Sequence, residues 1–184
     1  MTANLLQRPL RLTLHASDAL PDGMSWKILE GYVIATTWSG DGDVISLGIW
    51  SPGDLISSEQ PAITPLELNC LTTVVVEKIE LNTNEQQQLL DHERKMLAEL
   101  LAIQRIRSAD ARLIKLLQWI ARSFGQVNSH GCRLSLSELN LTHRQLAELC
   151  GLTRVTVTKI LSRFRLGGQL LAVGESDLLI PSLP

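Results

Sequence analysis

The sequence predicts an α+β fold made of a small antiparallel β-roll, a long helix and a C-terminal winged helix-turn-helix. Short β-branched stretches separated by turn residues fill the first part of the chain, which predicts strands. The apolar residues then change to a helical period. Two capped amphipathic helices joined by a glycine, followed by a hairpin pattern, end the chain. We therefore divide the chain into residues 1–82, 83–107 and 108–184.

The composition is that of a soluble globular protein, since 45% of the 184 residues are apolar and 20% are charged. No run approaches the roughly 18 apolar residues that span a bilayer, and the N-terminus lacks the apolar core of a signal peptide. We expect a cytoplasmic protein without a membrane partner. Three scattered cysteines, Cys70, Cys132 and Cys150, predict reduced thiols and neither a disulfide framework nor a metal site.

Residues 1–82 read as short antiparallel strands. Their β-branched and aromatic stretches are separated by Gly, Pro, Asp and Ser, which supply turn conformations. Several such strands at regular spacing predict a small roll or barrel. The expected strands cover residues 11–14, 26–38, 44–50 and 68–79, with turns at 21–23, 39–43 and 51–54.

A helix is expected from Asn84 to Arg107, with Thr83 or Asn84 as its cap. Its apolar stripe is wider than packing on a small roll requires, and a spacing near seven predicts pairing with a second copy as a coiled coil. The alternative is a helix packed only on its own domain. The residues predicted for the dimer interface are Leu89, Met96, Leu97, Leu100 and Ile103.

The C-terminal region begins with a second amphipathic helix, residues 108–124, whose apolar face is expected to form the core of this domain. A loop over 125–131 and a short strand pair over 132–139 follow. After the helix-turn-helix, strands over 169–173 and 178–181 around a turn at 174–177 predict a hairpin, the wing.

The segment from Leu141 to Arg165 carries the functional signal. Thr142 can cap a first helix and Thr153 a second, while Gly151 tolerates the positive φ that the sharp turn between them requires. From residue 142 to residue 165 there are five cations and one anion, whereas residues 1–83 carry 4 Lys+Arg against 10 Asp+Glu. Positive charge concentrated on such a hairpin predicts DNA binding. The alternative is a solvated cationic hairpin.

The run from Thr142 to Lys159 resembles the helix-turn-helix of the Crp/Fnr superfamily of bacterial transcription regulators, and within it the cyanobacterial global nitrogen regulator group. Glu30-Gly-Tyr-Val33 resembles the "KGxV" strand of that family's cupin-like effector roll, and Ser51 to Ile56 its "xxGDxxG" turn. The resemblance implies a homodimeric, sequence-specific DNA-binding regulator. If it activates transcription, RNA polymerase is a further partner. The roll is short for the family, so we expect no large enclosed ligand cavity within it.

Cyclic-nucleotide-binding members of the family hold the cyclic phosphate with an Arg-Ser pair. The corresponding stretch here, residues 56–69, contains Glu59 but no arginine. A desolvated phosphate without a cation would be costly, so we expect no cyclic AMP binding. No cofactor is predicted, and two alternatives stay open: an unidentified small-molecule effector, or none.

The residues expected to contact bases lie at the front of the second helix. Arg154 presents a fork of donors that fits guanine N7 and O6, and Val155 can touch a thymine methyl. The nitrogen-regulator relatives share the Arg-Val-Thr-Val-Thr run and read GTA with its inverted TAC, so the resemblance implies a similar half-site. The predicted base contacts are Arg154, Val155, Thr156 and Lys159, and the predicted phosphate contacts are Thr142, Arg144, Thr158 and Arg163.

Catalysis has no support in the sequence. It contains no nucleophile motif, Walker-type loop or Gly-x-Gly-x-x-Gly, so we expect no catalytic residue. The alternative function is a protein-interaction module that uses the long apolar helix to join a partner.

Overall fold

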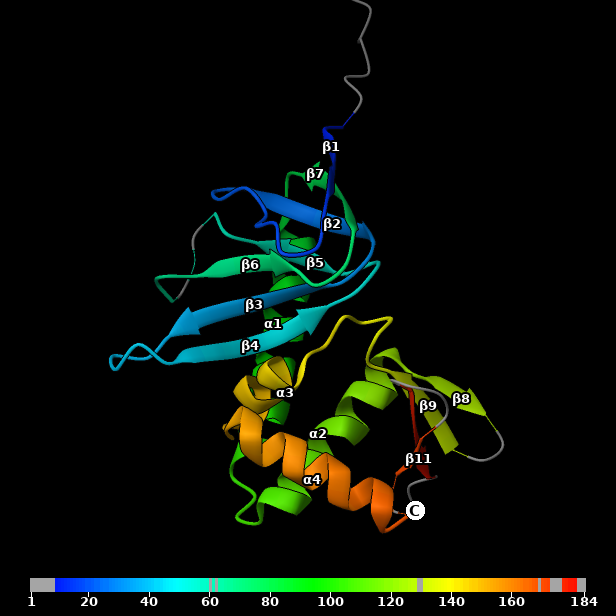
Figure 1. The fold of residues 1–184 in the computed structure, drawn as a ribbon. Helices are drawn as coiled ribbons and strands as arrows, with labels where there is room; N and C mark the ends of the chain where they lie inside the picture. The colour runs from blue at the N-terminus through cyan, green and yellow to red at the C-terminus, as the bar shows by residue number, and fades with distance from the viewer. Residues whose placement is uncertain are drawn as a thin grey trace, which may run out of the picture.

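The computed structural model describes residues 9–59, 61, 63–128, 131–168, 170–172 and 177–181. The β-roll lies at one end of the molecule and the C-terminal domain at the other, with helix α1, Thr83–Gln104, running beside both (Figure 1). This is the predicted α+β architecture of roll, long helix and helix-turn-helix domain. Among the described residues, no helix combines the length and apolarity needed to cross a membrane.

The roll consists of two antiparallel sheets that face each other across an apolar core. One has the strand order β1-β7-β2-β5 and the other β4-β3-β6. Trp26, Ile28, Val33 and Val74 are fully buried between them. The strands are β1 Arg11–Leu14, β2 Ser25–Glu30, β3 Val33–Trp38, β4 Val44–Trp50, β5 Leu55–Ser57, β6 Glu67–Cys70 and β7 Val74–Ile79.

Two of the predicted strands are each divided in the structure. The stretch 26–38 breaks between β2 and β3 at Gly31, whose φ is 81°. A Cβ at this position would collide with the carbonyl oxygen of Thr73, so only glycine fits the close approach. Residues 71–73 separate β6 from β7 in the same way, and the chain changes sheets at both breaks.

Helix α1 begins one residue earlier than predicted, because Asn82 is its cap. The Asn82 side chain accepts from the backbone N–H of Glu85, and the Glu85 carboxylate accepts from the Asn82 N–H, each at 3.0 Å. This reciprocal capping box satisfies two N–H groups of the first turn. The helix ends at Gln104, three residues before the expected Arg107.

The buried face of α1 packs within its own chain. Gly48 of β4 has no side chain, and a Cβ there would collide with the Met96 sulfur. Four of the five residues predicted for the dimer interface are therefore accounted for by intramolecular packing, whereas Leu97 is 41% exposed. The four that lie in the core of the chain are Leu89, Met96, Leu100 and Ile103.

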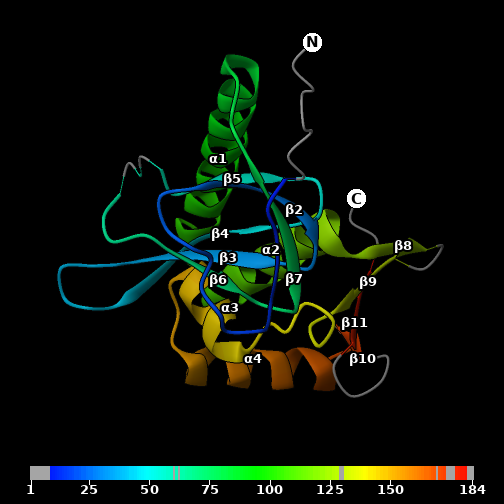
Figure 2. The same ribbon diagram turned by 90° about the horizontal axis from the view of Figure 1, so that it is seen from above.

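The exposed apolar residues of α1 form a different stripe. Leu90, Leu97 and Leu101 are 42%, 41% and 61% exposed. Steps of seven and four residues place the three side chains on one side of a helix. Figure 2 shows one end of α1 projecting past the roll, and Leu90 and Leu97 also line the cavity between the roll and α1.

The C-terminal domain packs helices against a small sheet of strand order β10-β11-β9-β8. Helix α2, Ala109–Phe124, begins one residue after the expected start, because Ser108 is its cap. Strand β10, Leu171–Ala172, pairs with β11, Asp177–Pro181, as the expected wing hairpin does. Gln169 and the turn at 174–177, except Asp177, lie outside the described residues.

The prediction of a strand pair over 132–139 is wrong. One strand, β9, covers Gly131–Ser135, and its partner β8, Gln126–Asn128, comes from the predicted loop. Residues 136–140 turn instead, since the Ser135 hydroxyl accepts from the backbone N–H of Glu138 at 3.2 Å. A serine side chain that bonds the backbone competes with strand pairing.

The thiols of Cys70 and Cys150 are buried in the core and should be unreactive in the folded protein. Burial raises the pKa of Cys150 from 9.0 to about 11, against the effect of Arg112. Burial, aided by the Asp18 carboxylate, raises the pKa of Cys70 to about 11. Each thiol has a higher pKa in the folded state than in the unfolded state, so folding favours its protonated form. The resulting stability is fully present below pH 9 and is lost as the pH rises through about 11.

We therefore expect the melting temperature to fall more steeply between about pH 9 and 11 than it does in a Cys70→Ala, Cys150→Ala double variant. Differential scanning calorimetry across this pH range measures both. Parallel curves would show that the thiols keep ordinary pKa values in the folded state.

Candidate nucleic-acid interface

Helices α3, His143–Cys150, and α4, Arg154–Leu166, form the predicted helix-turn-helix. Thr142 caps α3 in a capping box with Gln145, and Thr153 caps α4 by accepting from the N–H of Thr156. Gly151 ends α3 in the left-handed conformation at φ 60°, ψ 46°. Both caps and the glycine lie where the sequence predicted them, so local signals set the bounds of the two helices.

An arginine that sequence analysis did not identify holds the turn. Arg112 of α2 donates through Nη1 to the carbonyls of Cys150 and Gly151, at 3.2 and 3.1 Å, and through Nε to that of Ile106 at 2.9 Å. The last carbonyls of a helix have no intrahelical donor, so these bonds satisfy groups that the sharp turn leaves unpaired. The carbonyls at the end of α3 need hydrogen-bond donors, and this need was the one signal from which a basic residue on α2 could have been predicted.

The predicted base-contacting face of α4 is open to solvent. Arg154, Val155 and Lys159 are exposed, Val155 by 61%, and among the described residues neither cation has an ion-pair partner. The fourth residue, Thr156, is half-buried and shares a hydrogen bond of 2.8 Å with the hydroxyl of Thr153. Figure 1 shows α4 on the side of the C-terminal domain that faces away from the roll.

The four predicted phosphate contacts already have partners in the chain. Arg144 pairs with Glu148 at 2.9 Å, and Arg163 pairs with Asp110 at 2.5 Å. The Thr142 hydroxyl donates to Gln145 at 2.9 Å. Thr158 donates to the carbonyl of Arg154 at 3.0 Å, within its own helix.

A histidine joins the two helices beside this face. The His143 Nδ1 lies 2.9 Å from the Thr158 hydroxyl, which links the start of α3 to α4. Burial lowers the pKa of His143, and the charges of Arg165 and Arg154 lower it further. A neutral imidazole near pH 7 follows, so the cationic charge of this face comes from its arginines and lysine.

Side-chain hydrogen bonds fix the helix-turn-helix domain to the rest of the chain. Asn140, at φ 50°, donates from Nδ2 to the carbonyl of Leu71 in the roll at 2.6 Å. Gln104, the last residue of α1, donates to the carbonyl of Leu149 at 3.1 Å. Trp119 of α2 donates to the Glu99 carboxylate on α1 at 2.7 Å. The position of α3 therefore depends on both the roll and α1.

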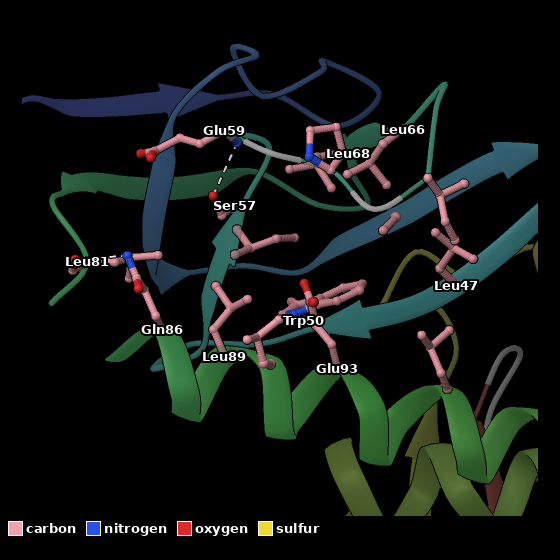
Figure 3. Close-up of a pocket in the computed structure, with 16 residues that line it drawn as sticks. Leu47, Trp50, Ser57, Glu59, Leu66, Leu68, Leu81, Gln86, Leu89 and Glu93 are labelled. Atoms are coloured by element: carbon pink, nitrogen blue, oxygen red, sulfur yellow. Dashed lines mark hydrogen bonds between the residues drawn. The ribbon is translucent and has the colours of Figure 1, made fainter. Parts of the chain in front are cut away.

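A cavity of about 360 Å³ lies between the roll and α1, away from the helix-turn-helix (Figure 3). The cavity does not lie within the roll alone, because α1 supplies one of its walls. Its lining is mainly apolar. The lining residues come from strands β3 to β6, the loop between β5 and β6, and α1 with the residue Leu81 before it.

Comparison with known proteins assigns the family. The profile of the Crp-like helix-turn-helix domain matches residues 111–183. The chain is also 41% identical over 164 residues to the regulatory protein CysR of Synechococcus elongatus, covering 88% of this chain and 80% of that protein. The chain belongs to the Crp/Fnr family. It is a DNA-binding transcription regulator and not an enzyme.

Solved structures of the family share the fold. The regulator TTHB099 of Thermus thermophilus superposes with a TM-score of 0.74 at 17% identity, covering 94% of this chain and 92% of that one. FixK2 of Bradyrhizobium japonicum gives 0.75 at 15% identity, with coverages of 94% and 92%. These likenesses confirm the predicted architecture. The curated relative is a CysR and not a nitrogen regulator, so the predicted family is confirmed and its finer subdivision is not supported.

Proposed function

We propose that this Crp/Fnr regulator acts in the cytoplasm as a homodimer that reads a palindromic operator with GTA-like half-sites through residues 153–165. The observation that carries the proposal is the solvent exposure of the first turn of α4. Arg154 and Val155 stand exposed in its first turn, and no described residue forms an ion pair with the arginine.

The half-site follows from the chemistry of these two side chains. The guanidinium of Arg154 can donate two parallel bonds to N7 and O6 of one guanine. Val155 has no polar atom and can only touch an apolar group, for which the thymine methyl is the candidate in the major groove. Lys159, one turn further along, adds a charge that reaches a base edge or a phosphate. Neighbouring guanine and thymine contacts fit a GTA step.

Electrophoretic mobility shift with a duplex carrying GTA and inverted TAC, and with a scrambled duplex of equal length, tests the proposal. We expect tighter binding to the palindrome and affinities that fall steeply with salt. Equal affinity for the two duplexes would reject the half-site. Absence of any salt-sensitive binding would favour the protein-interaction module.

We propose dimerisation through α1 from a separate observation. Three leucines, Leu90, Leu97 and Leu101, form an exposed stripe on a 22-residue helix. A two-fold axis along this stripe would bury them and hold two copies of α4 for sites about one helical turn of DNA apart. Of the five residues predicted for the interface, Leu97 is the one that belongs to this stripe.

Replacing Leu97 with glutamate should convert the dimer to a monomer, because two like charges would be brought together in an apolar seam. Sedimentation equilibrium measures the change in mass. Val127→Glu is the matched control, since Val127 is 86% exposed on β8 and its charge should leave the mass unchanged. A Leu97→Glu protein that stays dimeric would place the interface elsewhere.

A further inference from the structure

His143 belongs to the helix-turn-helix but is not among the residues predicted to contact DNA. It is the first residue of α3, directly after the cap Thr142, and its side chain is half-buried beside α4. In a helix-turn-helix the first helix crosses the DNA backbone while the second lies in the groove, and phosphates bind readily at helix N-termini. With α4 in the major groove, the imidazole of His143 is therefore placed to meet the DNA backbone.

Hydrogen bonds decide which nitrogen of the His143 ring carries the proton. The hydroxyl of Thr158 donates to the backbone carbonyl of Arg154 at 3.0 Å. A hydroxyl has one hydrogen and can accept a second bond, so the Thr158 oxygen accepts from Nδ1 of the imidazole, which lies 2.9 Å away. The neutral ring then holds its proton on Nδ1, and Nε2 carries only a lone pair.

Nε2 of this neutral ring cannot bond to a phosphate. No group of the described residues forms a hydrogen bond with Nε2, so this nitrogen is available to a ligand. A phosphate oxygen is also an acceptor, and two acceptors do not form a hydrogen bond. Once Nε2 gains a proton, the same contact becomes a charge-assisted hydrogen bond from a cation to an anion. A phosphate at this point therefore favours the imidazolium.

The surroundings of His143 keep its ring neutral until DNA is present. Burial lowers the pKa of the imidazole, and the guanidinium groups of Arg165 and Arg154 on α4 lower it further. On α3 itself, the neighbouring Arg144 is paired with Glu148 at 2.9 Å. Strand β4, α1 and α2 also pack against α3, and the structure describes no charge on them that shifts this pKa. A phosphate beside the ring opposes both arginines, so protonation accompanies binding.

We propose that the imidazole of His143 takes up a proton from solvent at Nε2 when the helix-turn-helix binds DNA, and donates it to a phosphate oxygen. The DNA affinity then rises as the pH falls, because each protomer holds up to one more proton in the complex than in the free protein. The inference rests on the proposed binding of DNA through α4, but it does not depend on the base sequence of the half-site.

Titration calorimetry of the full chain with the palindromic duplex, in two buffers of different ionisation enthalpy, measures the number of protons taken up. At about pH 7 we expect about one-half to one proton per protomer. For each protomer bound, the affinity should be roughly fivefold to tenfold higher at about pH 6 than at about pH 8. His143→Gln should take up almost no proton and lose most of this pH dependence. No uptake by the wild type, or equal uptake by His143→Gln, would overturn the proposal.

Three further variants separate the proton of His143 from other effects. His143→Arg carries a permanent charge and should bind at about pH 8 as tightly as the wild type does at about pH 6, without proton uptake. Thr158→Val removes the oxygen that holds the proton on Nδ1, so the neutral ring can place it on Nε2 and the uptake should fall. The control His15→Gln deletes an exposed imidazole just after β1 in the roll and should keep the wild-type uptake. Full uptake in Thr158→Val, or reduced uptake in His15→Gln, would also overturn the assignment.

The scrambled duplex, titrated in the same way, separates this inference from the half-site. A phosphate contact is independent of base sequence, so both duplexes should cause the same proton uptake. Equal affinities for the two duplexes together with this uptake would reject the half-site and support the inference. A preference for the palindrome without proton uptake would overturn the inference while the half-site stands.

Discussion

Replacing Leu146 with alanine should lower the free energy of unfolding by about 2 to 5 kcal/mol. The side chain is fully buried on α3, the helix that contacts α4, α2, α1 and strand β4. Truncation removes apolar contacts in this core and leaves a cavity that rigid neighbours can fill only in part. Urea unfolding followed by circular dichroism measures the loss.

Leu166→Ala is the matched control for Leu146, because it deletes the same atoms from a side chain that is 92% exposed at the end of α4. Its stability should change by less than about 0.5 kcal/mol. Equal losses in the two variants would mean that α3 is not the packing centre of the domain. A loss confined to Leu146→Ala, with DNA binding lost in proportion to the unfolded fraction, agrees with the structure.

The helix-turn-helix could be predicted almost to the residue because its signals are local. A capping threonine acts within three residues of itself, and the φ of Gly151 is a property of that residue alone. The recognition face follows from these, since the caps fix where α4 starts and the helical period then fixes which residues face outward. Arg154, Val155 and Lys159 therefore lie exposed where the pattern placed them.

The packing of α1 could not be predicted in the same way. A stripe of leucine, methionine and isoleucine residues tells which side of the helix is apolar, but not which part meets the roll. The contact of Met96 with Gly48 decides this, and it joins residues 48 positions apart. Periodicity carries no information about such a pairing. The pattern therefore does not separate the residues that pack within the chain from Leu90 and Leu101, which are exposed.

The groups that sequence analysis missed share this dependence on distant partners. Arg112 meets Cys150 across 38 positions, and Asn140 meets Leu71 across 69. Each is an ordinary residue in its own segment, so motif and composition offered no reason to select it.

Replacing Arg154 with alanine should weaken binding to the palindromic operator by about 1 to 3 kcal/mol per half-site and relax selectivity at one guanine. The side chain is exposed and has no ion-pair partner among the described residues, so the truncation should cost no folding stability. A dimer loses the contact twice, which makes this the largest effect expected on DNA binding. Titration of each base substitution at the guanine position measures the selectivity.

Arg144→Ala separates base reading from charge. It removes one cation from α3, where the side chain pairs with Glu148. Binding to all DNA sequences should weaken alike, and the affinity should depend less steeply on salt concentration. Arg154→Lys sharpens the comparison, because lysine keeps the charge but loses the two-pronged geometry. If Arg154→Ala loses equal affinity for operator and random DNA, Arg154 contacts phosphate and not a base. Selectivity that is lost in both Arg154 variants and kept in Arg144→Ala supports a bidentate contact of Arg154 to a base.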